Sequence, residues 1–158
     1  MRILMVCLGN ICRSPLAEGV MRDKIGKYNL QAIVDSCGMG GWHVGEAPDS
    51  RAQQVAKNHG LDISQLRGRK FSRRDFDDFD IIYAMDYENY HDIMQLARNT
   101  WDRQKVRMIM NEVYPNENIS VPDPYYGVLQ DYETTWEMID EACEAITKKL
   151  QLNDGVQF

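Results

Sequence analysis

The stretch "MVCLGNICRSPLAEGV", residues 5–20, joins an apolar run to a helix start through a short loop. Residues 2–8 are almost wholly apolar, as expected for a strand that is buried on both faces. Residues 14–26 carry apolar side chains at helical spacing, with Ser14 as the expected N-cap and Pro15 at the first helical position. The stretch therefore predicts a strand, a loop and a helix.

The rest of the chain repeats this alternation. We predict three more strands, over 31–38, 79–85 and 105–110, and three more helices, over 49–60, 86–97 and 131–151. Trp136 and Cys143 lie on the apolar face of the last helix and are expected in the core. The pattern predicts an α/β fold, a four-stranded parallel sheet with helices on both faces, and one domain over residues 1–158. Ligands bind such folds at the carboxyl ends of the strands, where the first loop lies.

Composition excludes several classes of protein. The 158 residues are 44% hydrophobic and 27% charged, with a formal net charge of -6. This charge argues against binding to nucleic acid, which normally needs a basic face. The apolar run at the N-terminus is too short for a signal peptide, and no segment approaches the ~18 apolar residues of a membrane helix. We expect no nucleic-acid or membrane partner and a cytoplasmic location.

The cysteines and histidines do not form a recognisable framework. The cysteines are too few and too scattered for a disulfide scaffold, and the three histidines have no metal-ligand spacing. We predict neither a metal site nor a cofactor.

The loop between the first strand and helix has the residues of an anion site. Its main-chain N–H groups and the helix N-terminus can face one concavity, and the Arg13 guanidinium matches two phosphate oxygens. Gly9 permits close approach, and Asn10 tolerates a left-handed backbone. Cys7 would be a thiolate in this positive potential, helped by a hydrogen bond from Ser14. The loop thus predicts an anion receptor with a nucleophile; the competing interpretation is a core cysteine near a solvated arginine.

A second segment supplies the acid that such chemistry requires. In "VPDPYYG", residues 121–127, Asp123 stands between two prolines in a loop-like sequence after the fourth strand. A carboxylic acid there can protonate a phenolate leaving group, and Tyr125 and Tyr126 can wall a pocket around an aromatic ring. The alternative is an ordinary Pro-rich surface turn.

Together, "VCLGNICRSPLAEGV" and "DPYYG" resemble the low-molecular-weight protein tyrosine phosphatases. The segments 41–52, 59–64 and 67–86 and the closing helix are also in register with this family. The resemblance implies a phosphate-binding loop after the first strand of a four-stranded parallel sheet. It further implies metal-independent hydrolysis of phosphotyrosine through a phosphocysteine intermediate, tyrosine-phosphorylated proteins as partners, and inhibition by phosphate or vanadate.

The resemblance also implies residue roles. Cys7 would be the nucleophile, Arg13 the phosphate clamp, and Asp123 the general acid and then the general base. Ser14 would stabilise the thiolate, while Asn10 and Ser36 would hold the shape of the loop. The implied phosphate-binding loop includes Leu8, Gly9, Asn10, Ile11, Cys12 and Ser14, and the implied pocket is lined by Leu8, Trp42, Tyr125 and Tyr126.

One departure from the family leaves a question open. Many members carry a histidine, bonded to the loop asparagine, just after the position of Ser64, where this chain has Gln65 and Leu66. Gln65 could replace it as a donor and Leu66 could not. The support of Asn10 is therefore open.

The same residues bear on several related activities. A thiol-dependent arsenate reductase of this fold needs two more cysteines near residues 80–90, and this chain has none there. Protein-arginine phosphatases tend to carry a threonine at the position of Ile11, so phosphotyrosine is the favoured substrate. A Cys-His hydrolase lacks an evident histidine partner. A sensor without turnover would leave Asp123 unexplained.

Two further features have alternative interpretations. Cys12 either packs beneath the loop or forms a reversible disulfide with Cys7 that protects it from irreversible oxidation. The basic run 67–74 is interpreted as a solvated turn and helix start whose charges screen one another, rather than as a docking patch for acidic phosphoproteins.

Overall fold

A four-stranded parallel sheet forms the centre of the protein. The computed structural model describes residues 1–153, and its strands are β1 (Arg2–Cys7), β2 (Ile33–Gly38), β3 (Ile81–Ala84) and β4 (Val106–Met108), in the order β2-β1-β3-β4. This confirms the predicted sheet. A single domain over 1–158 stays a prediction, because residues 154–158 lie outside the described part.

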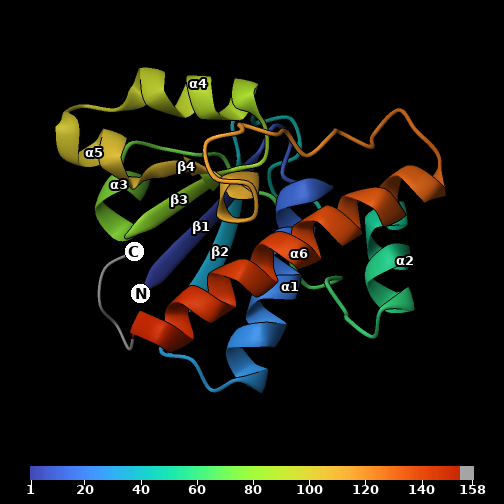
Figure 1. The fold of residues 1–158 in the computed structure, drawn as a ribbon. Helices are drawn as coiled ribbons and strands as arrows, with labels where there is room; N and C mark the ends of the chain where they lie inside the picture. The colour runs from blue at the N-terminus through green and yellow to red at the C-terminus, as the bar shows by residue number, and fades with distance from the viewer. Residues whose placement is uncertain (154–158) are drawn as a thin grey trace.

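Helices cover both faces of this sheet (Figure 1). The helices on one face are α1 (Arg13–Lys27), α2 (Ser50–Asn58) and α6 (Leu129–Asn153), while α3 (Asp75–Asp78) and α4 (Tyr87–Leu96) pack on the other. The short α5 (Thr100–Lys105) precedes β4, and a 3-10 helix, η1 (Ile109–Glu112), follows it.

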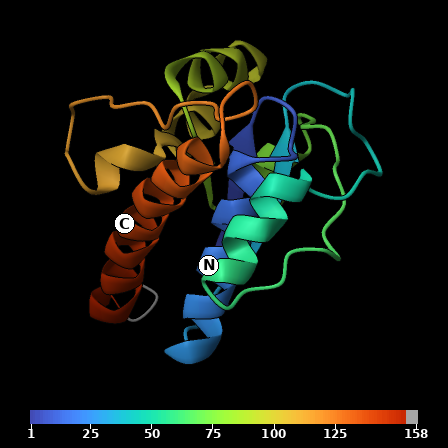
Figure 2. The same ribbon diagram turned by 90° about the vertical axis from the view of Figure 1, so that its right-hand side faces the viewer.

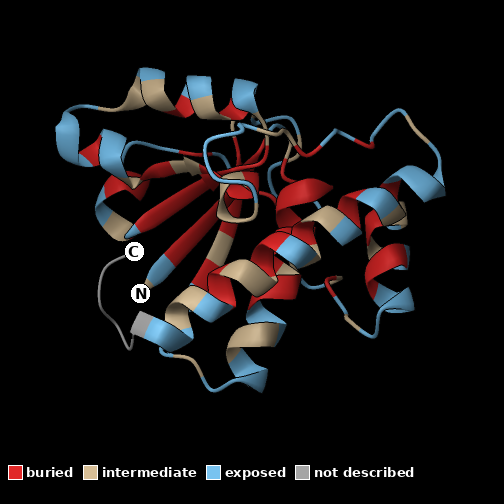
Figure 3. Cartoon of the chain, in the orientation of Figure 1, coloured by how far each residue is buried: buried red, intermediate tan, exposed pale blue. Residues whose placement is uncertain are grey.

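The β1 strand explains this layering. Ile3 and Met5 belong to the apolar cluster formed with α1, α2 and α6, whereas Leu4 and Val6 belong to the cluster that contains Phe76 and Ile93. Successive side chains of a strand point to opposite faces, so an uninterrupted apolar run is buried on both. Figure 3 shows the buried strands between partly exposed helices. Trp136 and Cys143 of α6 are buried, as predicted.

The structure corrects the predicted start of the first helix. α1 begins at Arg13 with Cys12 in the N-cap position, and no side chain caps it. Ser14 is therefore not the N-cap, and Pro15 is not the first helical residue. The Ser14 hydroxyl is instead engaged in the tertiary contacts described below, which replace the local cap.

Other boundaries differ by a few residues. The fourth strand ends at Met108, because the chain turns into η1 where the prediction extended the strand to 110. The sequence analysis missed α3 and α5, which have four and six residues and are too short to show a period. No helix among residues 1–153 has the length and apolar character needed to span a bilayer.

The fold brings several loops to one edge of the sheet. The carboxyl ends of β1, β2 and β3 lie side by side, and the main chain of Val121 donates to the Met85 carbonyl just beyond β3, at 2.8 Å. The loops after β1 and β2 and the segment before α6 gather at this end in Figure 2. This edge is where parallel sheets bind ligands.

Candidate active site

The loop from Cys7 to Arg13 lines a cavity of about 320 Å³ at this edge. The cavity is lined by Cys7, Leu8, Gly9, Ile11, Cys12, Arg13, Trp42, His43, Asp123, Tyr125 and Tyr126. All of these except His43 were predicted site residues. The predicted residues Asn10, Ser14 and Ser36 lie buried behind the cavity wall.

Cys7 ends β1 and its sulfur contacts the Ser14 hydroxyl. The distance from Cys7 Sγ to Ser14 Oγ is 3.0 Å, and Asn10 Nδ2 donates to the same Ser14 oxygen at 2.8 Å. Ser14 Oγ also lies 3.3 Å from the Cys37 carbonyl oxygen. Because Asn10 uses Ser14 as an acceptor, the single hydroxyl hydrogen is directed to Cys7 Sγ or to the Cys37 carbonyl.

Asn10 holds the turn of the loop. Its φ is 58°, in the left-handed region, and its side chain donates to Ser36 Oγ at 3.0 Å and accepts from the main-chain N of Arg69 at 3.0 Å. Together with the bond to Ser14, these contacts answer the question left open by the sequence. The amide is supported by two serines and the Arg69 main chain, while Gln65 is exposed.

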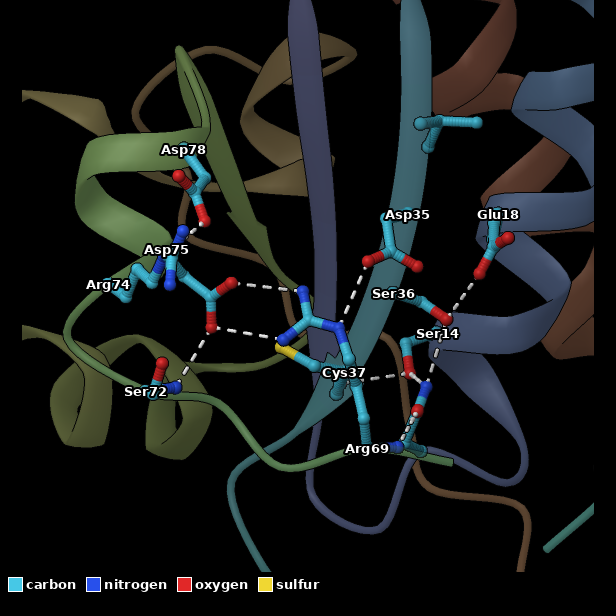
Figure 4. A network of polar contacts seen from close by, with 12 residues as sticks. Ser14, Glu18, Asp35, Ser36, Cys37, Arg69, Ser72, Arg74, Asp75 and Asp78 are labelled. Atoms are coloured by element: carbon cyan, nitrogen blue, oxygen red, sulfur yellow. Dashed lines mark hydrogen bonds and ion pairs between the residues drawn. The ribbon is translucent and has the colours of Figure 1, made fainter. Parts of the chain in front are cut away.

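A wider polar network fixes these supports (Figure 4). Ser36 Oγ donates to Glu18 Oε1 at 2.7 Å. The Arg69 guanidinium pairs with Asp35 and Asp75, each at 3.0 Å, and Asp75 is buried. Arg69 of the basic run is half-buried, and its charge is balanced by these two carboxylates. Its ion pairs anchor the segment whose main chain meets Asn10.

Arg13 is almost completely buried, with 2% of its side chain exposed. Its Nη1 donates to Asp86 Oδ2 at 2.6 Å and to the Val121 carbonyl at 2.9 Å, while Nη2 lies 3.5 Å from Asp123 Oδ2. Burial alone would lower the pKa of Arg13, but negative charge on Cys7, Asp86 and Asp123 raises it above its ordinary value. The guanidinium is thus a fixed cation at the cavity.

Asp123 lies at the mouth of the cavity. Its side chain is 41% exposed, Oδ1 accepts from the Tyr125 main-chain N at 3.1 Å, and Oδ2 faces Arg13. The carboxyl group thus lines the cavity beside Arg13 and is open to solvent.

Aromatic side chains form the walls. Tyr125 and Tyr126 meet edge to face with ring centroids 4.9 Å apart, and Trp42 is 70% exposed. The Trp42 ring lies across Gly40, where an added Cβ would come within 1.9 Å of it. Flat apolar walls of this kind suit an aromatic ring.

Cys12 differs from Cys7 in its surroundings. Its Sγ lies 3.3 Å from the Tyr132 hydroxyl, and burial raises the pKa of Cys12 to about 12. It is therefore a thiol at neutral pH, consistent with the packing interpretation. The four cysteines are free in the structure. A Cys7–Cys12 disulfide stays a prediction.

Three residues at or near the site were not predicted from the sequence. His43 packs against Gly9, and its Nδ1 lies 2.6 Å from Glu46 Oε2. Asp86 binds Arg13, and Arg51 contacts the loop that carries Asp123. Asp86 could have been found, because it directly follows a strand at the ligand-binding edge. His43 and Arg51 gave no comparable signal.

The arrangement suits nucleophilic attack on a bound phosphate ester. Cys7, with a sulfur that can act as a nucleophile, lines the cavity together with the Arg13 cation and with Asp123, whose carboxyl group can transfer a proton. Among residues 1–153, no three His, Cys, Asp or Glu side chains are grouped as metal ligands.

Comparison with known proteins shows which family this chain resembles over its length. The family model described as "Low molecular weight phosphotyrosine protein phosphatase" matches residues 2–156. The low molecular weight protein-tyrosine-phosphatase YfkJ of Bacillus subtilis is 37% identical over 153 residues, covering 94% of this chain and 95% of that protein. A Schizosaccharomyces pombe low molecular weight phosphotyrosine protein phosphatase is 44% identical over 129 residues, covering 80% and 81%.

A solved structure agrees over its whole length. The Entamoeba histolytica protein tyrosine phosphatase, crystallised with Hepes in the active site, superposes with a TM-score of 0.90 at 35% identity, covering 98% of this chain and 99% of that chain. Sequence and structure therefore agree that the chain belongs to the low-molecular-weight phosphotyrosine protein phosphatase family.

Proposed function

We propose that this protein is a protein tyrosine phosphatase that hydrolyses phosphotyrosine through a phosphocysteine intermediate. One observation carries the proposal. Cys7 and Arg13, from one loop, line a cavity together with Asp123, which lies far away in the sequence, and Arg13 Nη2 is 3.5 Å from Asp123 Oδ2. Membership of the family supports the same activity.

The first step transfers the phosphoryl group to Cys7. The thiolate attacks phosphorus, an S–P bond forms and the bond from phosphorus to the tyrosine oxygen breaks. Asp123, in its protonated form, gives its proton to that oxygen, so that tyrosine leaves as a neutral phenol. Arg13 and the loop N–H groups bind the phosphoryl oxygens as their charge shifts.

The second step regenerates the enzyme. Water attacks phosphorus, the Asp123 carboxylate takes a proton from it, and the S–P bond breaks. Inorganic phosphate leaves, Cys7 is again a thiolate and Asp123 is again protonated. The fixed Arg13 serves both steps, since the group that it binds stays in place while the nucleophile changes.

The physiological substrates in this proposal are tyrosine-phosphorylated proteins in the cytoplasm. The reaction uses no cofactor and no nucleic-acid or membrane partner. Phosphate and vanadate inhibit it, because both can occupy the site that receives the phosphoryl group.

Turnover by the purified protein tests this proposal. We expect hydrolysis of phenyl phosphate in the presence of EDTA, loss of turnover in Cys7→Ser, and a phosphoryl label on wild-type Cys7 after rapid quenching. Asp123→Ala should lose roughly 10²–10⁴-fold with phenyl phosphate and less with nitrophenyl phosphate. Full turnover by Cys7→Ser would refute the nucleophile, and equal losses with both esters would refute the acid.

Phosphoarginine is the second candidate substrate. The crystal structure of the Drosophila arginine phosphatase DARP superposes with a TM-score of 0.87 at 35% identity, covering 94% of this chain and 97% of that one. Ile11 lines the cavity here, and its bulk disfavours a guanidinium-type substrate. Matched phosphotyrosine, phosphoserine and phosphoarginine peptides decide the question. We expect the first to have the highest kcat/KM, and a preference for phosphoarginine would replace the proposed substrate.

A further inference from the structure

Arg51, at the start of α2, contacts the loop that carries the general acid. We call residues 121–128 the acid loop. Arg51 Nη2 donates to the Tyr125 carbonyl at 2.9 Å, and Nη1 donates to the Gly127 carbonyl at 3.1 Å. Both carbonyls lie just beyond Asp123 in the sequence. One planar guanidinium therefore spans the part of the acid loop that follows the catalytic carboxyl group.

The same guanidinium is tied to the phosphate-binding loop. Arg51 Nε and Nη2 donate to the two carboxylate oxygens of Asp49, at 3.1 and 3.0 Å. The main-chain N of Asp49 in turn donates to the Ile11 carbonyl at 2.8 Å. Although partial burial opposes it, the hydrogen bonds from Arg51 lower the pKa of Asp49, which therefore stays charged. A continuous chain of polar contacts joins the two loops.

Two aromatic rings add to this hold. The Arg51 guanidinium carbon lies 4.7 Å from the Tyr132 ring centroid and 5.7 Å from the Tyr125 ring centroid. Both distances fall within the range of cation–π attraction. Tyr132 is itself fixed by burial and by its contact with Cys12.

Near Asp123 the acid loop is mostly exposed, apart from buried Pro124 and a hydrogen bond from Thr135 Oγ1 to the Pro122 carbonyl at 3.4 Å. Pro122, Asp123, Tyr125 and Tyr126 are exposed, and Tyr126 is 96% exposed. At its beginning, the loop is held by the hydrogen bond from Arg13 Nη1 to the Val121 carbonyl. Beyond Asp123, the hydrogen bonds from Arg51 to the Tyr125 and Gly127 carbonyls anchor the loop in the same way. The general acid thus lies between two arginine anchors.

We propose that Arg51 is a positioning residue that keeps Asp123 within reach of the leaving-group oxygen. The inference rests on the proposed function. Without Arg51, the acid loop spends less time over the cavity, while Cys7 and Arg13 keep their own contacts. Loss of Arg51 should therefore impair protonation of the leaving group rather than nucleophilic attack. This gives an effect that depends on the leaving group, which a general loss of stability would not produce.

A series of aryl phosphates tests this directly. We would measure kcat/KM for esters from nitrophenol, a good leaving group, to phenol, a poor one, with Arg51→Met and Arg51→Lys. Arg51→Met should lose about tenfold or more with phenyl phosphate and about twofold with nitrophenyl phosphate. Arg51→Lys should show the same trend with a smaller loss, because an ammonium cannot span both carbonyls and Asp49 at once.

Arg98→Met is the matched control. Arg98 also binds two carboxylates, those of Asp77 and Asp102, and lies over the Phe76 ring, but it does not line the cavity. Its replacement should leave kcat/KM unchanged for every ester. A loss in Arg98→Met like that in Arg51→Met would mean that both effects come from stability, and would overturn the inference.

A double variant separates the inference from the proposed function. Arg51→Met should cause little further loss in an Asp123→Ala background, because the acid that it positions is already absent. Equal losses across the esters, or fully additive losses in the double variant, would overturn the role of Arg51. If the loss of kcat/KM in Asp123→Ala depends on the leaving group and the loss in Arg51→Met does not, only this inference fails. If folded wild-type protein hydrolyses none of the esters, the proposed function fails with it.

If Arg51→Met does not fold, Arg51→Lys carries the test. If Arg51→Lys loses the same factor of kcat/KM with every ester, the inference is refuted.

Discussion

The sulfur of Cys7, which lines the cavity, and the buried hydroxyl oxygen of Ser14 lie 3.0 Å apart. Since Asn10 already donates to Ser14, the serine hydrogen is directed to the sulfur or to the Cys37 carbonyl. Ser14 therefore connects the shape of the loop to the charge of its nucleophile.

Ser14→Ala should slow alkylation of Cys7 at acidic pH. Hydrogen bonds to charged groups contribute about 1.5–3 kcal/mol, so we expect at least about a tenfold slower reaction with iodoacetate near pH 5.5. The rate of inactivation measures this, with phosphate added to show that the site is being modified. Ser72→Ala, at an exposed position, should react like wild type. Equal rates for all three proteins would contradict the role of Ser14.

Asn10→Gly and Asn10→Ala should separate the backbone of the loop from its hydrogen bonds. Glycine tolerates the φ of 58°, whereas alanine adds strain of about 1–3 kcal/mol. Both variants should have a lower kcat/KM, and thermal unfolding should occur at a lower temperature in Asn10→Ala than in Asn10→Gly. Asn29→Gly is the control, because Asn29 has a φ of 50° in an exposed turn. Full activity in Asn10→Gly would show that the amide contacts are dispensable.

Gly40→Ala should displace the Trp42 ring. An added Cβ would lie 1.9 Å from a ring carbon, so the indole must move away from the cavity wall. We expect about a fivefold higher KM for aryl phosphates with little change in kcat, since an aromatic contact contributes about 1 kcal/mol. In Gly41→Ala the nearest atom, Lys70 Cδ, would be 3.5 Å away, which is an ordinary contact. If both variants keep the wild-type KM, Trp42 does not bind the substrate ring.

The contribution of Glu18 to the free energy of unfolding should increase as the pH falls. Burial raises the pKa of Glu18, although the hydrogen bond from Ser36 and the charge of Arg22 oppose it. A carboxyl group with a raised native pKa contributes stability below its ordinary pKa of about 4.3, and this contribution is lost as the pH rises through the raised value. The difference in unfolding free energy between wild type and Glu18→Gln, measured in urea, should therefore shift in favour of wild type as the pH falls.

Glu144→Gln provides a control of opposite sign. The hydrogen bond from Lys24 lowers the pKa of Glu144, so its contribution is present at neutral pH and is lost as the pH falls through the lowered value. The same pH trend for both variants would show that the burial of Glu18 is not its cause.

The sequence predicted those features that follow from local pattern and sheet geometry. The run before Cys7 is apolar at every position of the β1 core, which determines a central strand. Parallel strands end at one edge, which is why Asp123 could be assigned to the same site as Arg13. Both inferences need only residue types and chain order.

The features that it missed depend on contacts between distant residues. Serine is a residue type that often caps helices, but the Ser14 hydroxyl contacts Asn10 and Cys7 instead. The support of Asn10 comes from the main chain of Arg69, whose position is determined by ion pairs with Asp35 and Asp75. Main-chain partners leave no residue-type signal in a single sequence.

The main-chain bonds from Met39 to Cys7, from Gly40 to Leu8 and from Asp49 to Ile11 have a consequence for how the site fluctuates. They attach the floor of the cavity to the segments that follow β2, so the floor opens only when the centre of the sheet opens. In amide hydrogen exchange, the donors of these bonds, Met39, Gly40 and Asp49, should belong to a slow unit, while the amides of the aromatic walls exchange through local motion. Substrate access is then a rearrangement of walls around a stationary nucleophile.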